Sequence, residues 1–181
     1  MKGFKVGFGS PAAMEKLGID RPLVAPISDA TLLDDGATVD ISTWTNPNIE
    51  LEIAVHVGAG LSLAIELVDV EFAPEDPERI LNSGIFHRHT ILSAPKAGLS
   101  PFSGRLTRDG EVVAATDDVA ALTGGHEAMV RVVEETIGRR LEAGEVVITG
   151  SIVPPTPIAP GQHWHGEVQG LGALAVTLSS G

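Results

Sequence analysis

Residues 49–72 of this 181-residue chain read IELEIAVHVGAGLSLAIELVDVEF. The runs Ile49–Val57 and Leu61–Phe72 are rich in the β-branched and apolar residues that favour strands. Gly58-Ala59-Gly60 between them is a turn signal. Since a short connection allows consecutive strands to pair, this stretch predicts two strands that can pair with each other.

Three glutamates interrupt these apolar runs. Glu50 and Glu52 share one face, because side chains alternate along a strand, and pairing could bring Glu66 beside them. Three converging carboxylates are strongly destabilising unless they are neutralised, and Mg²⁺ is an oxygen-preferring cation that neutralises such a cluster. Solvated strand faces explain an E-x-E pattern more often, so the spacing alone leaves both interpretations open.

The rest of the chain is also rich in strand signals, with few and short helices. No internal repeat or low-complexity linker is present, so we expect one domain over residues 1–181 of a β-rich α+β class with a rolled or barrel-like sheet. Pro22 and Pro26 predict an irregular segment. Further strands are predicted at Phe4–Phe8, Ala37–Thr43, Thr90–Ser93 and Val146–Thr149, hairpins at Leu106–Ala114 and Gly166–Leu178, and helices at Pro11–Leu17, Glu78–Ile85 and Gly124–Glu142.

Composition excludes several classes of protein and of site. The chain has no cysteine, so disulfides, thiolate nucleophiles and cysteine-based zinc sites are excluded. The net charge of −12, with only 12 scattered Lys and Arg residues, argues against nucleic acid as a partner. No apolar run approaches the ~20 residues of a membrane span, and the start of the chain lacks the pattern of a signal peptide. We therefore expect a cytoplasmic protein with no membrane partner.

Other side chains could carry chemistry. The pairs His87/His89 and His163/His165 would each share a strand face and could bind zinc or copper, although such pairs are usually surface or partly packed residues. Neither a G-x-S-x-G elbow nor a phosphate-binding glycine motif is present. Lys5 lies in the apolar run GFKVGF; it would either reach solvent from a sheet edge or, if half-buried, pair with an anionic group.

Several segments match one family in order along the chain. The chain resembles the 2-keto-4-pentenoate hydratase and 4-oxalocrotonate decarboxylase group of the fumarylacetoacetate hydrolase superfamily. The family's opening G-x-K-x-G-x-(T/S)-x-P…LG-x-D-x-P resembles GFKVGFGSPAAMEKLGIDRP (3–22). Its metal strand E-x-E-I-A resembles IELEIAV (49–55), and the strand of its third ligand resembles LAIELVD (63–69). The motif x-A-D-N-x-S is similar to RILNSG (79–84), the motif L-x-A-G-D-x-I-x-T-G-(S/A) to LEAGEVVITGSI (141–152), and the closing glycine-rich hairpin to VQGLGALAVTL (168–178).

This resemblance implies a mixed β-roll with one Mg²⁺ or Mn²⁺ per active site and small 2-oxo or 2-hydroxy-dienoate substrates. Glu50, Glu52 and Glu66 match the metal ligands, Lys5 matches a substrate-contacting and catalytic lysine, and Ser151 lies in a substrate-binding loop. The implied activity is hydration through a stabilised enolate, in aromatic catabolism. Members commonly form homo-oligomers, and paired hydratase–decarboxylase complexes make a partner enzyme conceivable.

The chain also departs from the pattern of this family. Pro22-Leu23-Val24-Ala25 stands where the family has P-D-(Y/F)-G, so that acid is missing, and Asp20 and Asp29 do not match its position. The connection before the Glu66 strand is short, and we expect no N-terminal extension of the kind that larger members carry. A more open site suits a bulkier substrate. Decarboxylation, tautomerisation and a non-catalytic ligand-binding or partner subunit therefore remain alternatives.

Overall fold

The structure is a computed structural model that describes residues 2–181, with Lys2 described by its backbone alone. Its centre is the hairpin expected from residues 49–72. Strand β5 (Pro47–His56) and strand β6 (Gly60–Asp69) pair antiparallel over their whole length. The register puts Glu50 opposite Glu66, so both side chains lie on the same face of the sheet. We call this the inner face.

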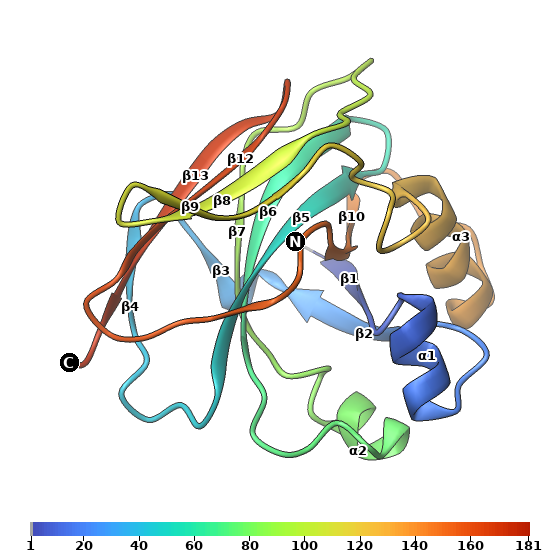
Figure 1. Cartoon of the computed structure of the whole chain (residues 1–181). Helices are drawn as coiled ribbons and strands as arrows, with labels where there is room; N and C mark the ends of the chain where they lie inside the picture. The colour runs from blue at the N-terminus through green and yellow to red at the C-terminus, as the bar shows by residue number, and fades with distance from the viewer. Residues whose placement is uncertain (1) are drawn as a thin grey trace.

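The first sheet has eight strands and curls around its inner face (Figure 1). Seven strands follow the order β2-β1-β10-β5-β6-β7-β3, and β11 pairs with β5. β1 pairs parallel with β10, and β10 pairs antiparallel with β5. The strands added to the hairpin are β1 (Lys2–Gly7), β2 (Leu23–Ser28), β3 (Leu32–Leu33), β7 (His87–Leu92), β10 (Glu145–Ser151) and β11 (Thr156–Pro157).

The second sheet has five strands and packs on the outer face of β5 and β6. Leu51 and Ile65 from the hairpin share this core with Trp164, and all three are fully buried. A side-chain carbon at Gly166 would lie 2.6 Å from Leu51 Cδ1, so any larger residue there would force the buried Leu51 to shift. The order is β4 (Ala37–Asp40), β13 (Gly172–Ser179), β12 (His163–Val168), β8 (Gly104–Arg108) and β9 (Glu111–Thr116).

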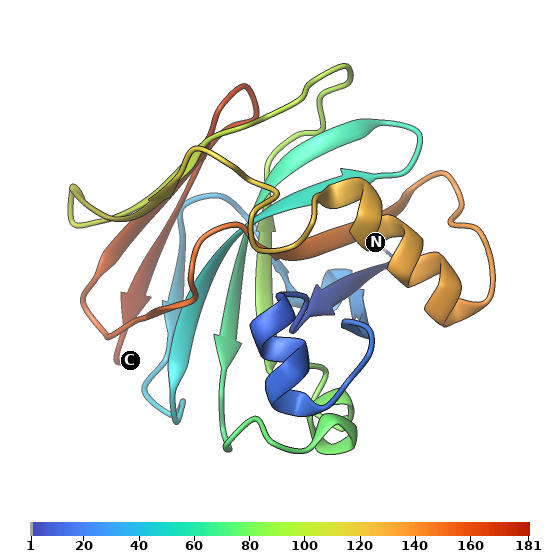
Figure 2. The same cartoon turned by 45° about the vertical axis from the view of Figure 1, so that its right-hand side comes forward.

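The helices are short and lie on the side of the hairpin opposite the second sheet (Figures 1 and 2). α1 (Pro11–Leu17) has the predicted range, with Ser10 as its N-cap and a left-handed Gly18 at its end. α2 (Pro77–Asn82) contacts β2, and α3 (His126–Ile137) contacts β10, β5 and β1. A 3₁₀ turn spans Asp29–Thr31. Within residues 2–181, no helix has the length and apolar character that crossing a membrane requires.

The curl of the first sheet follows from one contact. β1 and β6 are separated by β10 and β5, which in a flat sheet would hold them roughly 14 Å apart. Lys5 Nζ on β1 nevertheless lies 2.5 Å from Glu66 Oε1 on β6. The curvature of the strands around the inner face (Figure 1) brings these two side chains together, and the rolled sheet confirms the β-rich α+β class.

Most differences from the expected elements lie at their ends. The last two strands, β12 and β13, form one predicted hairpin. β8 and β9 form the other, where Asp109 and Gly110, with φ of 51° and 87°, make a type I′ turn. The irregular segment expected around Pro26 is wrong, because Pro26 lies in β2, an edge strand where a missing N–H is tolerated. The prediction that α3 extends to Glu142 is wrong, because Gly138 adopts the left-handed conformation and ends it.

The strand expected over Leu61–Phe72 also ends early, at Asp69. The carboxylate of Asp69 accepts hydrogen bonds from the backbone N–H groups of Thr45 and Asn46, at 2.9 and 2.7 Å. These bonds fix the segment that leads into β5. A buried acid therefore anchors the start of one central strand to the end of the other.

Candidate metal centre and active site

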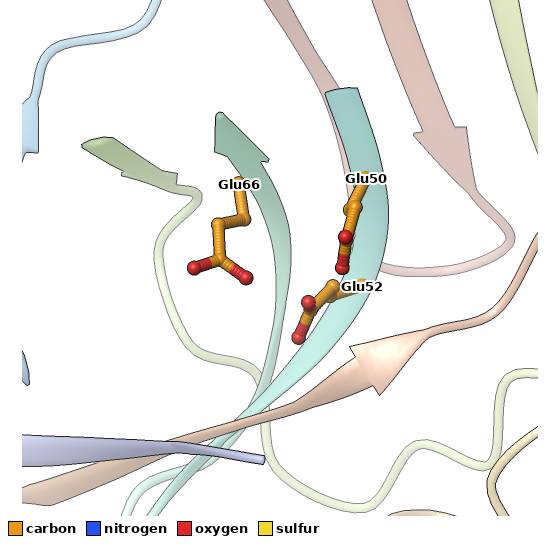
Figure 3. A group of neighbouring side chains, drawn as sticks. All are labelled: Glu50, Glu52 and Glu66. Carbon is orange, nitrogen blue, oxygen red and sulfur yellow. The ribbon is translucent and has the colours of Figure 1, made fainter. Parts of the chain in front are cut away.

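Three carboxylates converge on the inner face of the central hairpin (Figure 3). Glu50 and Glu52 come from β5 and Glu66 from β6, and one oxygen of each lies within 4.8 Å of the others. Glu52 and Glu66 are fully buried, whereas Glu50 is half-buried and lines a cavity. In the part of the chain that the structure describes, this is the one group of three or more His, Asp or Glu side chains with metal-binding spacing.

Two oxygens of this cluster have no hydrogen-bond partner although they are buried. Glu52 Oε2 accepts from the Gly150 N–H at 2.8 Å, and Glu66 Oε1 accepts from Lys5 Nζ at 2.5 Å, which leaves Glu52 Oε1 and Glu66 Oε2 unpaired. Unpaired buried carboxylate oxygens are costly. A hard divalent cation satisfies such oxygens, so the donor set fits Mg²⁺ or Mn²⁺.

The Gly150 N–H reaches Glu52 because of a tight local geometry. Gly150 has a φ of +88°, and a side-chain carbon there would lie 3.3 Å from Thr123 Cγ2 and 3.4 Å from the Val6 carbonyl oxygen. β10 shifts its register against β5 at this position, between Ile148 and Ser151. The T-G-S segment recognised in the sequence is therefore the bulge that orients one carboxylate of the cluster.

Burial and mutual repulsion change the acidity of the three glutamates. Burial, followed by the negative charge of Glu66, raises the pKa of Glu50 to about 7. Burial and the charges of Glu66 and Glu50 raise the pKa of Glu52 well above its usual range. Burial would also raise the pKa of Glu66, but the charge of Lys5 and the hydrogen bond from His87 outweigh it, and the net pKa is lowered.

Cation affinity is therefore expected to rise with pH. Protons must leave Glu50 and Glu52 before a cation binds, so affinity should fall about tenfold per pH unit for each displaced proton below about pH 7. The raised folded-state pKa of Glu50 also means that the metal-free fold loses stability as pH rises from 4.5 towards 7. Calorimetric titration with Mn²⁺ in two buffers of different ionisation enthalpy counts the released protons. Binding that released none at about pH 6 would contradict this assignment.

Lys5 is buried, with 2% of its surface exposed, so the alternative of an edge lysine reaching solvent is wrong. Its Nζ donates to Glu66 Oε1 at 2.5 Å and to the Ile85 carbonyl oxygen at 2.9 Å. An ammonium has three N–H donors, and Lys5 also lines the cavity beside Glu50. Two bonds fix the amine, and one N–H remains for a ligand.

His87 belongs to the site, although the sequence indicated it as a candidate zinc or copper ligand together with His89. Its Nδ1–H donates to Glu66 Oε1 at 2.6 Å, and its Nε2 is hydrogen-bonded to the Thr31 hydroxyl at 2.8 Å. The shared strand face expected for His87 and His89 is wrong, because β7 shifts its register against β6 next to Leu67. His89 instead stacks on Trp44, with ring centroids 6.1 Å apart.

Replacing His87 with leucine is expected to weaken Mn²⁺ binding by roughly 10–100-fold, the usual effect of removing a group that orients a metal ligand. The imidazole and Thr31 hold the Glu66 carboxylate in place, and leucine can do neither. Calorimetric titration measures the change. His89→Leu is the matched control, because it removes an imidazole from the same strand without touching Glu66. Equal losses in both variants would show a general effect on β7.

A cavity of about 600 Å³ leads to this cluster. Lys5, Glu50 and Ser151 all contribute to its lining, so the structure brings together the residues singled out from the sequence. The Ser151 hydroxyl donates to the Val153 carbonyl oxygen at 2.6 Å, which leaves its oxygen as an acceptor. Asp20 and Asp29 are exposed and do not line the cavity, so neither replaces the missing family acid.

Known proteins with similar sequences include hydratases and decarboxylases. No family model matches it. A 4-oxalocrotonate decarboxylase from Pseudomonas putida is 28% identical over 201 residues, covering 96% of this chain and 75% of that protein. A 2-keto-4-pentenoate hydratase from Burkholderia vietnamiensis is 24% identical over 203 residues, covering 98% and 78%. The chain is a homologue of this hydratase and decarboxylase group.

Solved structures agree with the hydratase and decarboxylase group. A 4-oxalocrotonate decarboxylase from Pseudomonas putida G7, complexed with magnesium and adipate, matches with a TM-score of 0.83 and 25% identity over 97% of this chain and 77% of that one. A fumarylpyruvate hydrolase from Pseudomonas aeruginosa, complexed with Mn²⁺ and pyruvate, matches with a TM-score of 0.72 and 18% identity over 99% and 89%. The second likeness concerns the fold alone.

Proposed function

We propose that this protein is a Mg²⁺-dependent lyase that hydrates a 2-hydroxy-2,4-dienoate or related 2-oxo acid through an enolate. The observation that carries the proposal is the convergence of Glu50, Glu52 and Glu66, with two unpaired buried oxygens, at an apolar cavity. The hydratases and the magnesium-complexed decarboxylase among the relatives support it. Mn²⁺ is the alternative cation.

Three glutamates hold the cation in this proposal, and the rest of the chain keeps them in place. A bound Mg²⁺ supplies Lewis acidity toward the carboxylate and C2 oxygen of the substrate. Gly150 N–H and His87 orient Glu52 and Glu66 by hydrogen bonds. The buried surroundings exclude water from these contacts, which strengthens them.

Lys5 is the proposed catalytic and substrate-binding residue. Its remaining N–H is donated to the substrate oxygen on which negative charge develops, and Nζ is the group at the cavity floor that can pass a proton. The Ser151 oxygen accepts a hydrogen bond from the substrate. Hydration adds H and OH from one water across a carbon–carbon double bond, so no other reactant is needed.

Decarboxylation of a 2-oxo acid is the second candidate, because a decarboxylase is among the most similar relatives. In this reaction a second carboxylate, β to the ketone, leaves as CO₂, and the electron pair of the broken C–C bond forms the same kind of enolate. It needs no positioned water, which suits a site without the family's additional acid. A non-catalytic ligand-binding or partner subunit is the alternative from another class.

Calorimetric titration of oxalate in saturating Mg²⁺ tests the proposal, because oxalate imitates the two adjoining oxygens of the enolate without reacting. We expect oxalate to bind in the presence of Mg²⁺ and not in its absence. Consumption of a hydroxydienoate, followed by ultraviolet absorbance with and without CO₂ release, then separates hydration from decarboxylation. Oxalate that failed to bind with Mg²⁺ would overturn both enzymatic candidates.

The cellular setting is also proposed. A catabolic role in the breakdown of aromatic compounds suits the dienoate substrate class. A cytoplasmic location agrees with the cysteine-free sequence. A homo-oligomer agrees with the resemblance to the family. A partner enzyme is a further option for the assembly. Sedimentation of the purified protein alone measures the number of subunits.

A further inference from the structure

The cavity that leads to the three glutamates contains very little positive charge. Among the described residues that line it, Lys5 is the one basic side chain, and two of its three N–H donors already bind Glu66 and Ile85. The acid in the lining is Glu50. Three carboxylates, one ammonium and a divalent cation balance to a neutral site. One substrate carboxylate would share the cation and the remaining N–H of Lys5, whereas a second carboxylate would find no cation along the walls.

The walls beyond the glutamates are apolar. Phe8, Phe86, Val68, Val70, Leu122 and Pro154 line this part of the cavity. Apart from Lys5 and Glu50, the polar side chains of the lining carry no charge. They include Asn48 on β5 and Asn46, which directly precedes this strand. A volume of about 600 Å³ lies well inside the range of roughly 300–1,000 Å³ that takes drug-sized ligands. The space exceeds what a short dienoate alone would fill.

Backbone strain is concentrated in these walls. Phe8, Ile85 and Phe86 have φ of 56°, 56° and 62°, a region that non-glycine residues adopt only at a cost. They are three of the four non-glycine residues with positive φ in the part of the chain that the structure describes, and all three line the cavity. The rings of Phe8 and Phe86 lie 6.5 Å apart. Strain that persists at one cavity indicates a functional constraint on its shape.

We propose that the substrate is a monocarboxylate 2-oxo or 2-hydroxy-dienoic acid with a bulky apolar tail, and that the tail lies against Phe8 and Phe86. This inference rests on the proposed function. Burial of the tail is favourable in proportion to its apolar area. A second carboxylate at the same place would lose its water among apolar side chains and gain no cation, which is strongly unfavourable.

The decarboxylase of similar fold was solved with adipate, which is a dicarboxylate. The walls described here predict the opposite preference for this chain. They also favour hydration over decarboxylation of an oxalocrotonate, because an oxalocrotonate carries a carboxylate at each end. The substrate tail is therefore the feature in which this protein should differ from that relative.

Calorimetric titration of the full chain in saturating Mg²⁺ tests the inference with two ligands of the same shape. 2-Oxoadipate ends in a carboxylate, and 6-methyl-2-oxoheptanoate has an isopropyl group in its place. We expect the isopropyl ligand to bind at least about tenfold more tightly than 2-oxoadipate, and also more tightly than pyruvate. Equal binding, or preference for 2-oxoadipate, would overturn the inference even if oxalate binds. Failure of oxalate to bind would instead remove the proposed function and this inference with it.

A variant at the wall separates the tail contact from a general effect. Phe8→Gly removes the ring and relieves the backbone strain, since glycine adopts positive φ readily. We expect it to abolish most of the preference for 6-methyl-2-oxoheptanoate and to leave the affinities for oxalate and pyruvate within about twofold. Phe102→Ala is the matched control, because Phe102 is exposed and lies outside the cavity lining. An unchanged preference in Phe8→Gly would contradict the placement of the tail.

Discussion

Replacing Glu52 with glutamine is expected to abolish cation binding while leaving the metal-free fold at least as stable. Glu52 is fully buried, and burial and the charges of Glu66 and Glu50 raise its pKa, which favours the neutral acid when no cation is bound. Glutamine has the same shape as that neutral acid, and its carbonyl oxygen can still accept the Gly150 N–H. The fold therefore loses no contact, whereas the cation loses one of its three anionic oxygens.

The expected loss is more than about 100-fold in affinity for Mn²⁺, since the change removes a ligand rather than a group behind it. Turnover should fall at least as far, because every step needs the cation. Thermal unfolding with and without Mg²⁺ gives the second readout: the wild type is stabilised by the ligand it binds, and the variant is not. Glu71→Gln is the control, as Glu71 is partly exposed and pairs with Arg88. Undiminished Mn²⁺ affinity in Glu52→Gln would remove Glu52 from the metal centre.

The convergence of the three acids could be predicted because it depends on local rules. The turn Gly58-Ala59-Gly60 sets which residues of the two strands face each other, and alternation sets the face of each side chain. A turn over residues 58–60 would pair Glu52 with Glu66, whereas the turn in the structure spans residues 57–59 and pairs Glu50 with Glu66. Both registers leave the three acids on the same face. The convergence of the acids was thus available from about twenty residues of sequence, without knowledge of the remaining strands.

The neighbours of the acids could not be predicted in this way, because they depend on long-range structure. Lys5 reaches Glu66 only because the sheet curls, and curvature is a property of all its strands. His87 reaches Glu66 because one extra residue in β7 changes which side chains face inward. Pro26 lies in a strand because that strand is at a sheet edge, a place that only the complete topology defines.

Replacing Lys5 with methionine is expected to reduce turnover by roughly 10²–10⁴-fold while leaving Mg²⁺ affinity unchanged or tighter. The range is that of a positioned proton donor or acceptor. The two effects have opposite signs because Lys5 is a cation 2.5 Å from a proposed ligand oxygen: it serves a negatively charged substrate, but it repels a second cation. Methionine is unbranched and matches the lysine side chain as far as Cε, so it fills most of the same buried space.

Comparing the loss of turnover with the change in Mg²⁺ affinity in Lys5→Met distinguishes a catalytic amine from a merely structural one. Lys5→Met leaves Glu66 with His87 as its remaining partner, so the metal-free protein should be less stable, and saturating Mg²⁺ should restore the stability by neutralising the carboxylates. Turnover must then be measured at saturating Mg²⁺, with Lys96→Met, at an exposed lysine, as the control. If turnover and Mg²⁺ affinity fell by the same factor, Lys5 would act only by holding Glu66 in place. A fall in turnover alone requires that the amine acts on the substrate, because the metal centre would then be intact.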